Sequence, residues 1–230
     1  MVRSGTSQGP HGIREASSQY FPYMFEYEVD LMHFYKPVDC GDVPIVTGNN
    51  DRSHELIYQY VTEILEGGAK VIFVGGDHSA PIPAARALSD FHKNGRIGYM
   101  HIDCHLDTSP DWGGVTNTNC SPVSRLLDLP NCDSRNICHM GSRNALNPKD
   151  WFDFFTDTNA CIIPMMEVVE RGVEECTHEI FQKAWDGTAG IYTSWDTDSL
   201  DASCMPGTTA PECFGIKSRE AIQIAKIAGK

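Results

Sequence analysis

The chain has 230 residues, a length that suits one large domain or two small ones and is ample for a hydrophobic core. Its formal net charge of −13 argues against a nucleic-acid partner. The nine cysteines are an odd number without CxxC pairs, which argues against a disulfide framework or a zinc ribbon and favours free thiols. No apolar run reaches the length of a membrane span and the start does not resemble a signal peptide, so we expect a soluble cytoplasmic protein without membrane contact.

Helix and strand patterns alternate along the first hundred residues. The predicted elements are a helix beginning near 12–16, a strand from Val38 to Val46, a helix over 52–66, a strand over 70–74, a helix from near Pro83 to about His92, and a strand over 97–100. Asn50 or Asp51 is the expected cap of the helix over 52–66, and Gly67-Gly68 would end it.

The second half continues the same alternation. A polar loop over 108–121 is followed by helical patterns at 122–129, 148–156 and 174–185, by strand patterns at 136–141, 160–163 and 190–193, by a turn-rich loop at 206–211, and by a helix from near Ser218. Alternating helices and strands of this kind predict a single α/β unit.

Polar side chains gather in three short clusters, each directly after an apolar, strand-like run. The clusters are Gly75-Gly76-Asp77-His78-Ser79, His101-Ile102-Asp103-Cys104-His105-Leu106-Asp107 and Ser194-Trp195-Asp196-Thr197-Asp198. Ligands of an open parallel sheet bind beyond the carboxyl ends of its strands. Three such ends side by side would bring together two histidines and four carboxylates, namely His78, Asp103, His105, Asp107, Asp196 and Asp198.

These six side chains are predicted to bind a pair of divalent cations. Residues two apart in an extended chain share a face, which groups Asp103, His105 and Asp107. The same spacing groups Asp196 with Asp198. Carboxylates packed this closely would repel one another and take up protons unless cations neutralised them. Oxygen-rich ligands with two imidazoles suit Mn²⁺ and leave Ni²⁺ as a second option. The simplest alternative to a metal site is that the three clusters are solvated loops.

Several polar neighbours of these clusters are expected to be structural. The parity of Cys104 turns it away from the ligands, so we interpret it as a small buried residue. His101 shares the parity of the ligands but lies deeper on its strand, behind them. Asp77 would bond either His78 or the backbone of its tight turn, and Arg143 would be a structural ion-pair partner.

The three clusters resemble those of the ureohydrolase family of arginases, agmatinases and related guanidino-group hydrolases, and the agmatinase-like branch is the most similar. The resemblance covers nearly the whole chain, including the segments from Arg3 to Ser17 and from Met205 to Gly215. It implies a three-layer α/β/α, arginase-like fold with a mostly parallel central sheet. It also implies a strand before Arg3 and another after Lys230, so residues 1–230 would form one ureohydrolase-type domain, a fragment lacking a strand at each end.

The resemblance also implies roles within the site. It implies a binuclear manganese centre with the six residues as ligands and with Asp103 and Asp196 as bridging ligands. Glu220 aligns with a position where some members place a glutamate near the guanidinium, which implies a catalytic and substrate-binding role. The family commonly forms trimers or hexamers, so a homo-oligomer is expected.

Two residues depart from the family pattern near the expected substrate pocket. Asn119 stands where many members carry a histidine thought to shuttle protons, and an asparagine cannot titrate. Trp195 replaces a residue that is more often smaller or Phe-like. Both are candidate substrate-binding residues, and they favour a small substrate such as guanidine.

The residues and the resemblance together predict a binuclear-metal hydrolase that cleaves a C–N bond of a guanidino compound, agmatine-like or guanidine itself, to urea plus an amine or ammonia. Paired divalent ions can activate water, an acidic site attracts a guanidinium, and Asp107 could pass a proton to the leaving nitrogen. One alternative is a catalytically weak partner subunit of a mixed ureohydrolase oligomer, suggested by Asn119. Another is a single-zinc deacetylase of the related fold, which His78 and the second ligand set disfavour.

Overall fold

A four-stranded parallel sheet forms the centre of the computed structural model, which describes residues 3–229. Its order is β5-β4-β3-β6, and each neighbouring pair is parallel. The strands are β3 (Arg96–Ile102), β4 (Cys132–Met140), β5 (Cys161–Ile163) and β6 (Thr188–Trp195). Parallel neighbours require crossover connections, and helices supply them here. The mostly parallel α/β sheet predicted from the sequence is therefore confirmed.

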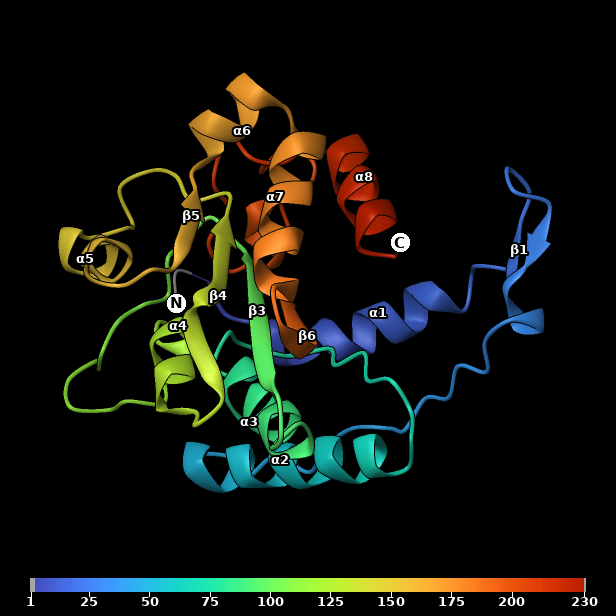
Figure 1. Cartoon of the computed structure of the whole chain (residues 1–230). Helices are drawn as coiled ribbons and strands as arrows, with labels where there is room; N and C mark the ends of the chain where they lie inside the picture. Colours follow the sequence, from blue (N-terminus) through green and yellow to red (C-terminus); the bar gives the residue numbers. More distant parts are fainter. Residues whose placement is uncertain (1–2, 230) are drawn as a thin grey trace.

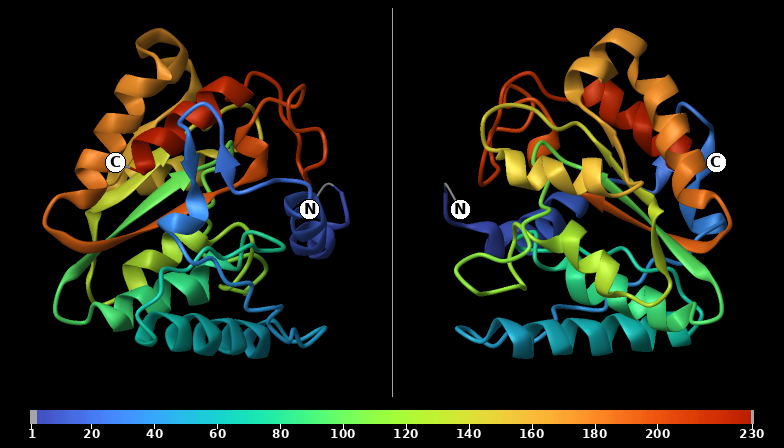
Figure 2. Two further views of the ribbon diagram at one scale, coloured as in Figure 1. Left: turned by 90° about the vertical axis from the view of Figure 1, so that its right-hand side faces the viewer. Right: turned by 60° about the vertical axis from the view of Figure 1, so that its left-hand side comes forward.

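Helices cover both faces of this sheet (Figures 1 and 2). One face carries α6 (Met165–Arg171), α7 (Val173–Trp185) and α8 (Ser218–Ala228). The other carries α3 (Pro81–Phe91), α4 (Pro122–Arg125) and α5 (Lys149–Asp157), with α2 (Asn50–Glu66) packed on α3. The alternation of side chains along each strand divides the core: Met100 and Ile102 pack toward α7, and Tyr99 packs toward α3 and α4.

Helix α7 packs unusually close to the sheet because β3 has a glycine at the contact. A Cβ placed on Gly98 would lie 2.1 Å from the carbonyl oxygen of Ala184, so no other residue fits there without moving the helix. Around this contact lies the largest apolar cluster, which joins β3, β4 and β5 to α6, α7 and α8. This core fixes the strands whose carboxyl ends carry the polar clusters.

The first part of the chain lies outside this three-layer body. Helix α1 (Gly9–Ser17) is followed by a two-stranded hairpin, β1 (Tyr23–Met24) and β2 (Val29–Asp30), which stands apart from the sheet in Figure 1. The shorter 3-10 turns are η1 (Thr6–Gln8), η2 (Leu31–His33), η3 (Leu126–Asp128) and η4 (Thr197–Ser199). None of the helices between residues 3 and 229 is both long and apolar enough to cross a bilayer.

Most predicted elements are confirmed, with boundaries shifted by a few residues. The cap of α2 is Asn49, whose side chain accepts a hydrogen bond from the backbone of Arg52, and not Asn50 or Asp51. Helix α6 and the β1–β2 hairpin were not predicted, because both are short and their apolar residues show no clear period.

Two strand predictions are wrong. The segments at 38–46 and 70–74 contain no strand, and Ile72 is 92% exposed. Apolar, β-branched residues favour an extended chain, but a strand also needs a neighbour for its backbone groups, and no described segment pairs with either run. The strands expected before Arg3 and after Lys230 lie outside the described residues.

Candidate metal centre

Two of the three polar clusters meet where neighbouring strands end. Ile102 and Trp195, the last residues of β3 and β6, are register partners, so Asp103 and Asp196 leave the sheet side by side. The backbone amide of Asp196 donates to the carbonyl of Ile102 at 2.9 Å and prolongs the pairing. The carboxyl edge of a parallel sheet is where ligands bind, as the sequence pattern indicated.

The third cluster contributes His78, whose ring faces three carboxylates. Its Nδ1 lies 2.9 Å from Asp103 Oδ2, 3.1 Å from Asp107 Oδ2 and 3.0 Å from Asp196 Oδ2. We call these four residues the His78 group. The other ring nitrogen, Nε2, is 2.8 Å from Ser194 Oγ, and this bond orients the imidazole with Nδ1 toward the carboxylates.

A second group forms around His105. Its Nδ1 is 3.5 Å from Asp103 Oδ1 and 3.3 Å from Asp198 Oδ2. These three residues are the His105 group. Asp103 belongs to both groups, with one carboxylate oxygen turned toward each histidine. The arrangement is two adjoining sets of nitrogen and oxygen donors that share one carboxylate.

The donor set fits a pair of divalent cations. His78 Nδ1 and Asp103 Oδ2 are buried polar atoms that lack a hydrogen-bond partner of acceptable geometry within residues 3–229. Buried polar atoms of this kind are costly unless something else satisfies them, and a cation facing several oxygens and an imidazole nitrogen would do so. Two sets of four residues that share Asp103 each have donor atoms within 4.8 Å of one another: His78, His101, Asp103 and Asp107, and Asp103, Cys104, His105 and Asp198.

Charge in the centre is strongly perturbed. Burial lowers the pKa of His78, but the surrounding carboxylates outweigh it and hold that pKa well above its ordinary value. Burial raises the pKa of Asp103, yet three neighbouring histidines bring it well below the usual range. Burial and the nearby carboxylates raise the pKa of Asp198 to about 8. Four carboxylates in one buried place therefore demand positive charge, as protons or as metal ions.

The whole chain resembles one family of known proteins. The model of the "Arginase family" matches residues 1–230. The chain belongs to the arginase family. An agmatinase of Bacillus subtilis (strain 168) is 31% identical over 223 residues, which cover 95% of this chain and 70% of that protein. The predicted recognition, and with it a metal-dependent amidinohydrolase of this family, is confirmed.

Solved structures of the arginase superfamily agree with the fold. The formimidoylglutamase of Bacillus subtilis subsp. subtilis str. 168 superposes with a TM-score of 0.90 at 26% identity, over 99% of this chain and 70% of that one. A Trypanosoma cruzi formiminoglutamase with Mn²⁺ also reaches 0.90 at 23% identity, over 100% and 75% of the two chains. The predicted arginase-like fold is confirmed.

The side-chain alternation predicted for the second cluster, residues 101–107, is wrong in one respect. Strand β3 ends at Ile102, so residues 103–107 turn instead of alternating, and Asp107 has a left-handed backbone with φ of 49°. Cys104 consequently faces the centre, with its Sγ 3.3 Å from His105 Nδ1 and 3.2 Å from Asp198 Oδ1. Burial keeps the pKa of this thiol raised, so Cys104 is a protonated neighbour of the His105 group.

His101 lies behind Asp103, as expected. Its side chain is fully buried, and its Nε2 is 3.1 Å from Asp103 Oδ2. The ring stacks on His78, at 4.8 Å between centroids, and packs at a tilt against His139, at 5.2 Å. This buried column supports the shared carboxylate from the side opposite the solvent.

Within residues 3–229 Arg143 makes no ion pair, in contrast to the structural ion-pair role that the sequence suggested. Its guanidinium donates instead to backbone carbonyls, at 2.7 Å to Asp198 and 2.9 Å to Cys213. It thereby holds the loop that carries Asp198, a role for which the sequence has no signal because the partners are far apart along the chain. Gly141 has a left-handed backbone with φ of 109°, and a Cβ placed on it would lie only 2.9 Å from the Asp103 carbonyl oxygen. A side chain at this position would therefore displace Asp103.

The remaining predicted residues lie around the centre without joining it. Asp77 bonds the backbone of its own turn, through Ser79 N at 2.9 Å. The amide of Asn119 donates to Cys120 Sγ at 3.5 Å, in a loop tied to the stretch after Asp107 by the hydrogen bond from Ser109 N to the Cys120 carbonyl.

Trp195 and Glu220 have local partners. Trp195 packs against the apolar cluster under α7 and donates to Ser199 Oγ at 3.0 Å, on the strand face opposite to Ser194. Glu220 accepts a hydrogen bond from Lys217 N at 2.7 Å and so caps the first turn of α8. It borders a hollow of about 290 Å³ that contains none of the six predicted ligands.

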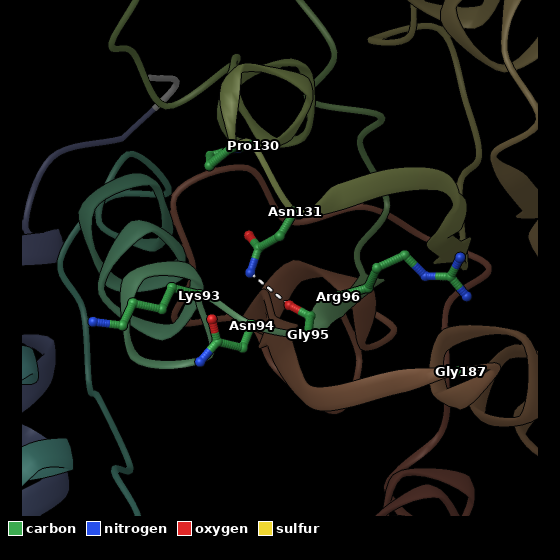
Figure 3. A pocket seen from close by; sticks show the side chains of 7 residues that line it. All are labelled: Lys93, Asn94, Gly95, Arg96, Pro130, Asn131 and Gly187. Carbon is green, nitrogen blue, oxygen red and sulfur yellow. Dashed lines mark hydrogen bonds between the residues drawn. The ribbon is translucent and has the colours of Figure 1, made fainter.

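A second hollow lies at the other end of the sheet. Figure 3 shows this open depression of about 550 Å³, where the Asn131 amide donates to the Gly95 carbonyl at 2.7 Å. Its lining comes from the amino ends of the strands: Lys93, Asn94, Gly95, Arg96, Pro130, Asn131 and Gly187. None of the six predicted ligands lines either of these two hollows, so the candidate centre is identified by its chemistry.

Proposed function

We propose that this arginase-family protein binds two Mn²⁺ ions and hydrolyses a C–N bond of a guanidino compound, releasing urea plus an amine or ammonia. The observation that carries the proposal is the sharing of Asp103 by two adjoining donor groups, with buried donor atoms that lack other partners. Oxygen-rich sites with imidazole suit Mn²⁺, the ion present with the Trypanosoma cruzi relative, and leave Ni²⁺ as the alternative.

The proposed ligands are His78, Asp103, Asp107 and Asp196 in the His78 group, and His105, Asp103 and Asp198 in the His105 group. Such a pair of ions supplies Lewis acidity and activates water as a nucleophile. Asp103 would orient both groups, and His101 would hold its carboxylate in place.

The chain's own residues would handle the substrate and its protons. The acidic centre attracts a cationic guanidinium. Asp107, a proposed ligand in the His78 group, would accept the proton of the attacking water and pass it to the leaving nitrogen. Asn119 would contribute a neutral amide at the rim instead of a titrating group.

Glu220 is the proposed contact for the far side of the guanidinium. The bond between Lys217 N and Glu220 engages one carboxylate oxygen. The start of α8 is tied to the loop after Asp198, because Ile216 N donates to the Ser199 carbonyl at 3.0 Å. Trp195, also proposed from the sequence, would act only indirectly, by fixing β6 beside Asp196.

The substrate itself is a choice among several amidines. The similarity to the Bacillus subtilis agmatinase favours agmatine, and the similarity to the formimidoylglutamase favours a formimidoyl amino acid. Both are candidates beside guanidinobutyrate, arginine and guanidine. The departures of Asn119 and Trp195 from the family pattern still favour guanidine. We propose a single domain, a homotrimer or homohexamer, and a cytoplasmic location consistent with nine free cysteines.

A substrate screen on the Mn²⁺-loaded protein tests this function. Each compound is incubated at equal concentration, and the released amine or ammonia is measured together with urea, because a formimidoyl substrate yields formamide. We expect urea from one guanidino compound with a higher kcat/KM than from the others. No turnover of any amidine by protein carrying two ions per chain would refute the proposal and favour a weak partner subunit.

A further inference from the structure

Two cysteines lie side by side on neighbouring strands of the sheet, well away from the candidate metal centre. Cys138 on β4 and Cys161 on β5 are register partners, so their side chains lie on the same face. Cys138 is fully buried, whereas Cys161 is half-buried on the outermost described strand. Neither residue is within hydrogen-bonding distance of a proposed metal ligand among the described contacts.

A lysine lies directly beside the more accessible of the two thiols. Lys183 of α7 has its Nζ 3.3 Å from Cys161 Sγ, and Glu179 holds that ammonium at 2.7 Å. The neighbouring Cys138 thiol, followed by Lys183, lowers the pKa of Cys161 to about 7, against the opposing effects of burial and of Glu179. The same contact and burial raise the pKa of Cys138, which stays protonated.

We propose that Cys138 and Cys161 form an oxidisable thiol pair, in which Cys161 reacts with hydrogen peroxide or a similar two-electron oxidant and Cys138 closes a disulfide. Lys183 stabilises the reacting thiolate by its charge and its N–H donors. A thiolate beside a cation and partly open to solvent is the form of cysteine that reacts with oxidants.

The steps balance in atoms and electrons. The Cys161 thiolate attacks one peroxide oxygen, the O–O bond breaks, and hydroxide leaves while sulfur becomes a sulfenic acid. Cys138 sulfur then attacks the Cys161 sulfur, the S–O bond breaks, and the Cys138 proton leaves with the hydroxyl as water. Two thiols are thus oxidised to one disulfide while one peroxide is reduced to two waters.

The strand geometry permits this bond. Neighbouring strands lie about 4.7–4.9 Å apart, which falls within the usual Cα separation of about 4.4–6.8 Å for a disulfide. The bond would tie β5 to β4 without crossing the core. The other buried thiol of this apolar cluster, Cys176, belongs to α7 and has no cysteine paired with it in the sheet register.

The experiment uses a full-length background with Cys40→Ser, Cys204→Ser and Cys213→Ser, because these three thiols are exposed. The protein is treated with hydrogen peroxide and digested without reduction, and the linked peptides are identified by mass spectrometry. Iodoacetamide alkylation of Cys161 is followed between pH 5.5 and 9.5. We expect a Cys138–Cys161 linked peptide and an alkylation midpoint near pH 7.

Matched variants separate charge from packing. Lys183→Met should slow the alkylation of Cys161 at pH 7 by roughly 3- to 10-fold and move its midpoint toward the ordinary cysteine value of about 8.5, whereas Lys183→Arg should keep the rate. Cys138→Ala should leave Cys161 as a sulfenic acid or beyond, and Cys176→Ala should change nothing. Peroxide-treated background with Cys138 still reduced, or Cys161 alkylated no faster than in the urea-unfolded chain at pH 7, would overturn the proposal.

Discussion

The two halves of the candidate metal centre are built from different kinds of structure. The His105 group stands on the sheet: Asp103 directly follows β3, and Arg143 clamps the loop of Asp198 through its carbonyls. Asn147 adds a second brace, because its side chain accepts from Leu106 N at 2.8 Å and donates to the Cys104 carbonyl at 2.9 Å. Most of the contacts that hold the His105 group involve backbone atoms or buried side chains.

The His78 group depends on a segment without sheet pairing. Residues 70–76, which lead to His78, have no strand partner among the described residues. His78 is fixed by one hydrogen bond to Ser194, and the next residue, Ser79, contacts His54 Nε2 at 3.1 Å. Asp103 and Asp196 are therefore prepositioned by the sheet, whereas the His78 imidazole is not. We therefore expect the His78 group to lose its ion first.

The largest effect should come from the residue that both halves share. Asp103→Ala removes a carboxylate oxygen from each group, so we expect both ions and all measurable hydrolysis to be lost. Metal content after dialysis against Mn²⁺, measured by inductively coupled plasma mass spectrometry, checks this. Asp128→Asn is the control, because Asp128 is exposed and its ion pair within residues 3–229 is with Arg125. An Asp103→Ala protein that kept two ions would refute the shared role.

The histidines allow the two halves to be broken separately. His78→Ala should leave about one ion per chain, because the braced His105 group is intact. His105→Ala should lower the Mn²⁺ occupancy of both positions, because the remaining His78 group lacks the bracing that supports the His105 group. Turnover should fall by about 10²-fold or more in each variant. Equal ion loss in the two variants would show that the halves are equally preformed.

Ser194→Ala sharpens the comparison by loosening one half only. Loss of a partner that orients a ligating histidine typically costs about 10- to 100-fold in metal affinity, and we expect a change of that size for the weaker ion. Competition with a Mn²⁺ indicator measures both affinities. Thr193→Ala is the matched control, because Thr193 is exposed on the same strand. An equal loss of Mn²⁺ affinity at both positions would show that Ser194 does not act through His78 alone.

The sequence predicted much of this site because its signals are local. A strand-like run followed by His or Asp is visible within a few residues, and β3 and β6 end about two residues beyond the predicted runs. Ser194 was within reach of the same reasoning, because it precedes Asp196 by two residues and shares its face. The metal ligands themselves remain a prediction that only ion binding can test.

The features that the sequence did not reveal depend on distant partners. The run at 70–74 has strand composition, but pairing is a property of neighbours that composition cannot supply. The side chain of Cys104 was predicted to point away from the ligands. This is wrong because the alternation of side chains stops with the last hydrogen bond of the ladder, after Ile102. Arg143 pairs with carbonyls about 55–70 residues away, so no spacing rule could find them.

Asp201 tests the support of the His105 half through pH. Its buried carboxylate accepts from Ser203 and from Gly215 N at 3.1 Å, and Lys217 Nζ lies 3.0 Å away. These contacts, with the Ser203 hydroxyl first, hold its pKa well below the usual value. The stabilisation is therefore complete above the ordinary aspartate pKa of about 3.9 and is lost as pH falls below it.

Asp201→Asn should accordingly lower the free energy of unfolding by about 1–3 kcal/mol at pH 7. The difference from the unmodified protein should shrink between pH 5 and pH 3. Urea unfolding curves at several pH values measure it, with Asp128→Asn expected to change stability by less than about 1 kcal/mol. A difference that stayed constant down to pH 3 would mean that the charge of Asp201 is not what stabilises this loop.

The smallest expected change concerns the rim, in the loop that follows Asp107. Asn119→His introduces a side chain of similar reach that titrates near pH 6.5, in a position where Asn119 now donates to Cys120 Sγ. Since Asn119 belongs to neither donor group, both ions should remain. A histidine that takes part in proton transfer would add a limb near neutrality to the pH dependence of kcat/KM, and general acid–base help can reach about 10²–10⁴-fold only where the geometry is right. We expect the new limb with little gain in rate, because the loop is held by Ser109 and Cys120 in its present shape. Metal content and the pH–rate profile are measured together, and a variant with both ions and an unchanged profile would show that position 119 takes no part in proton transfer.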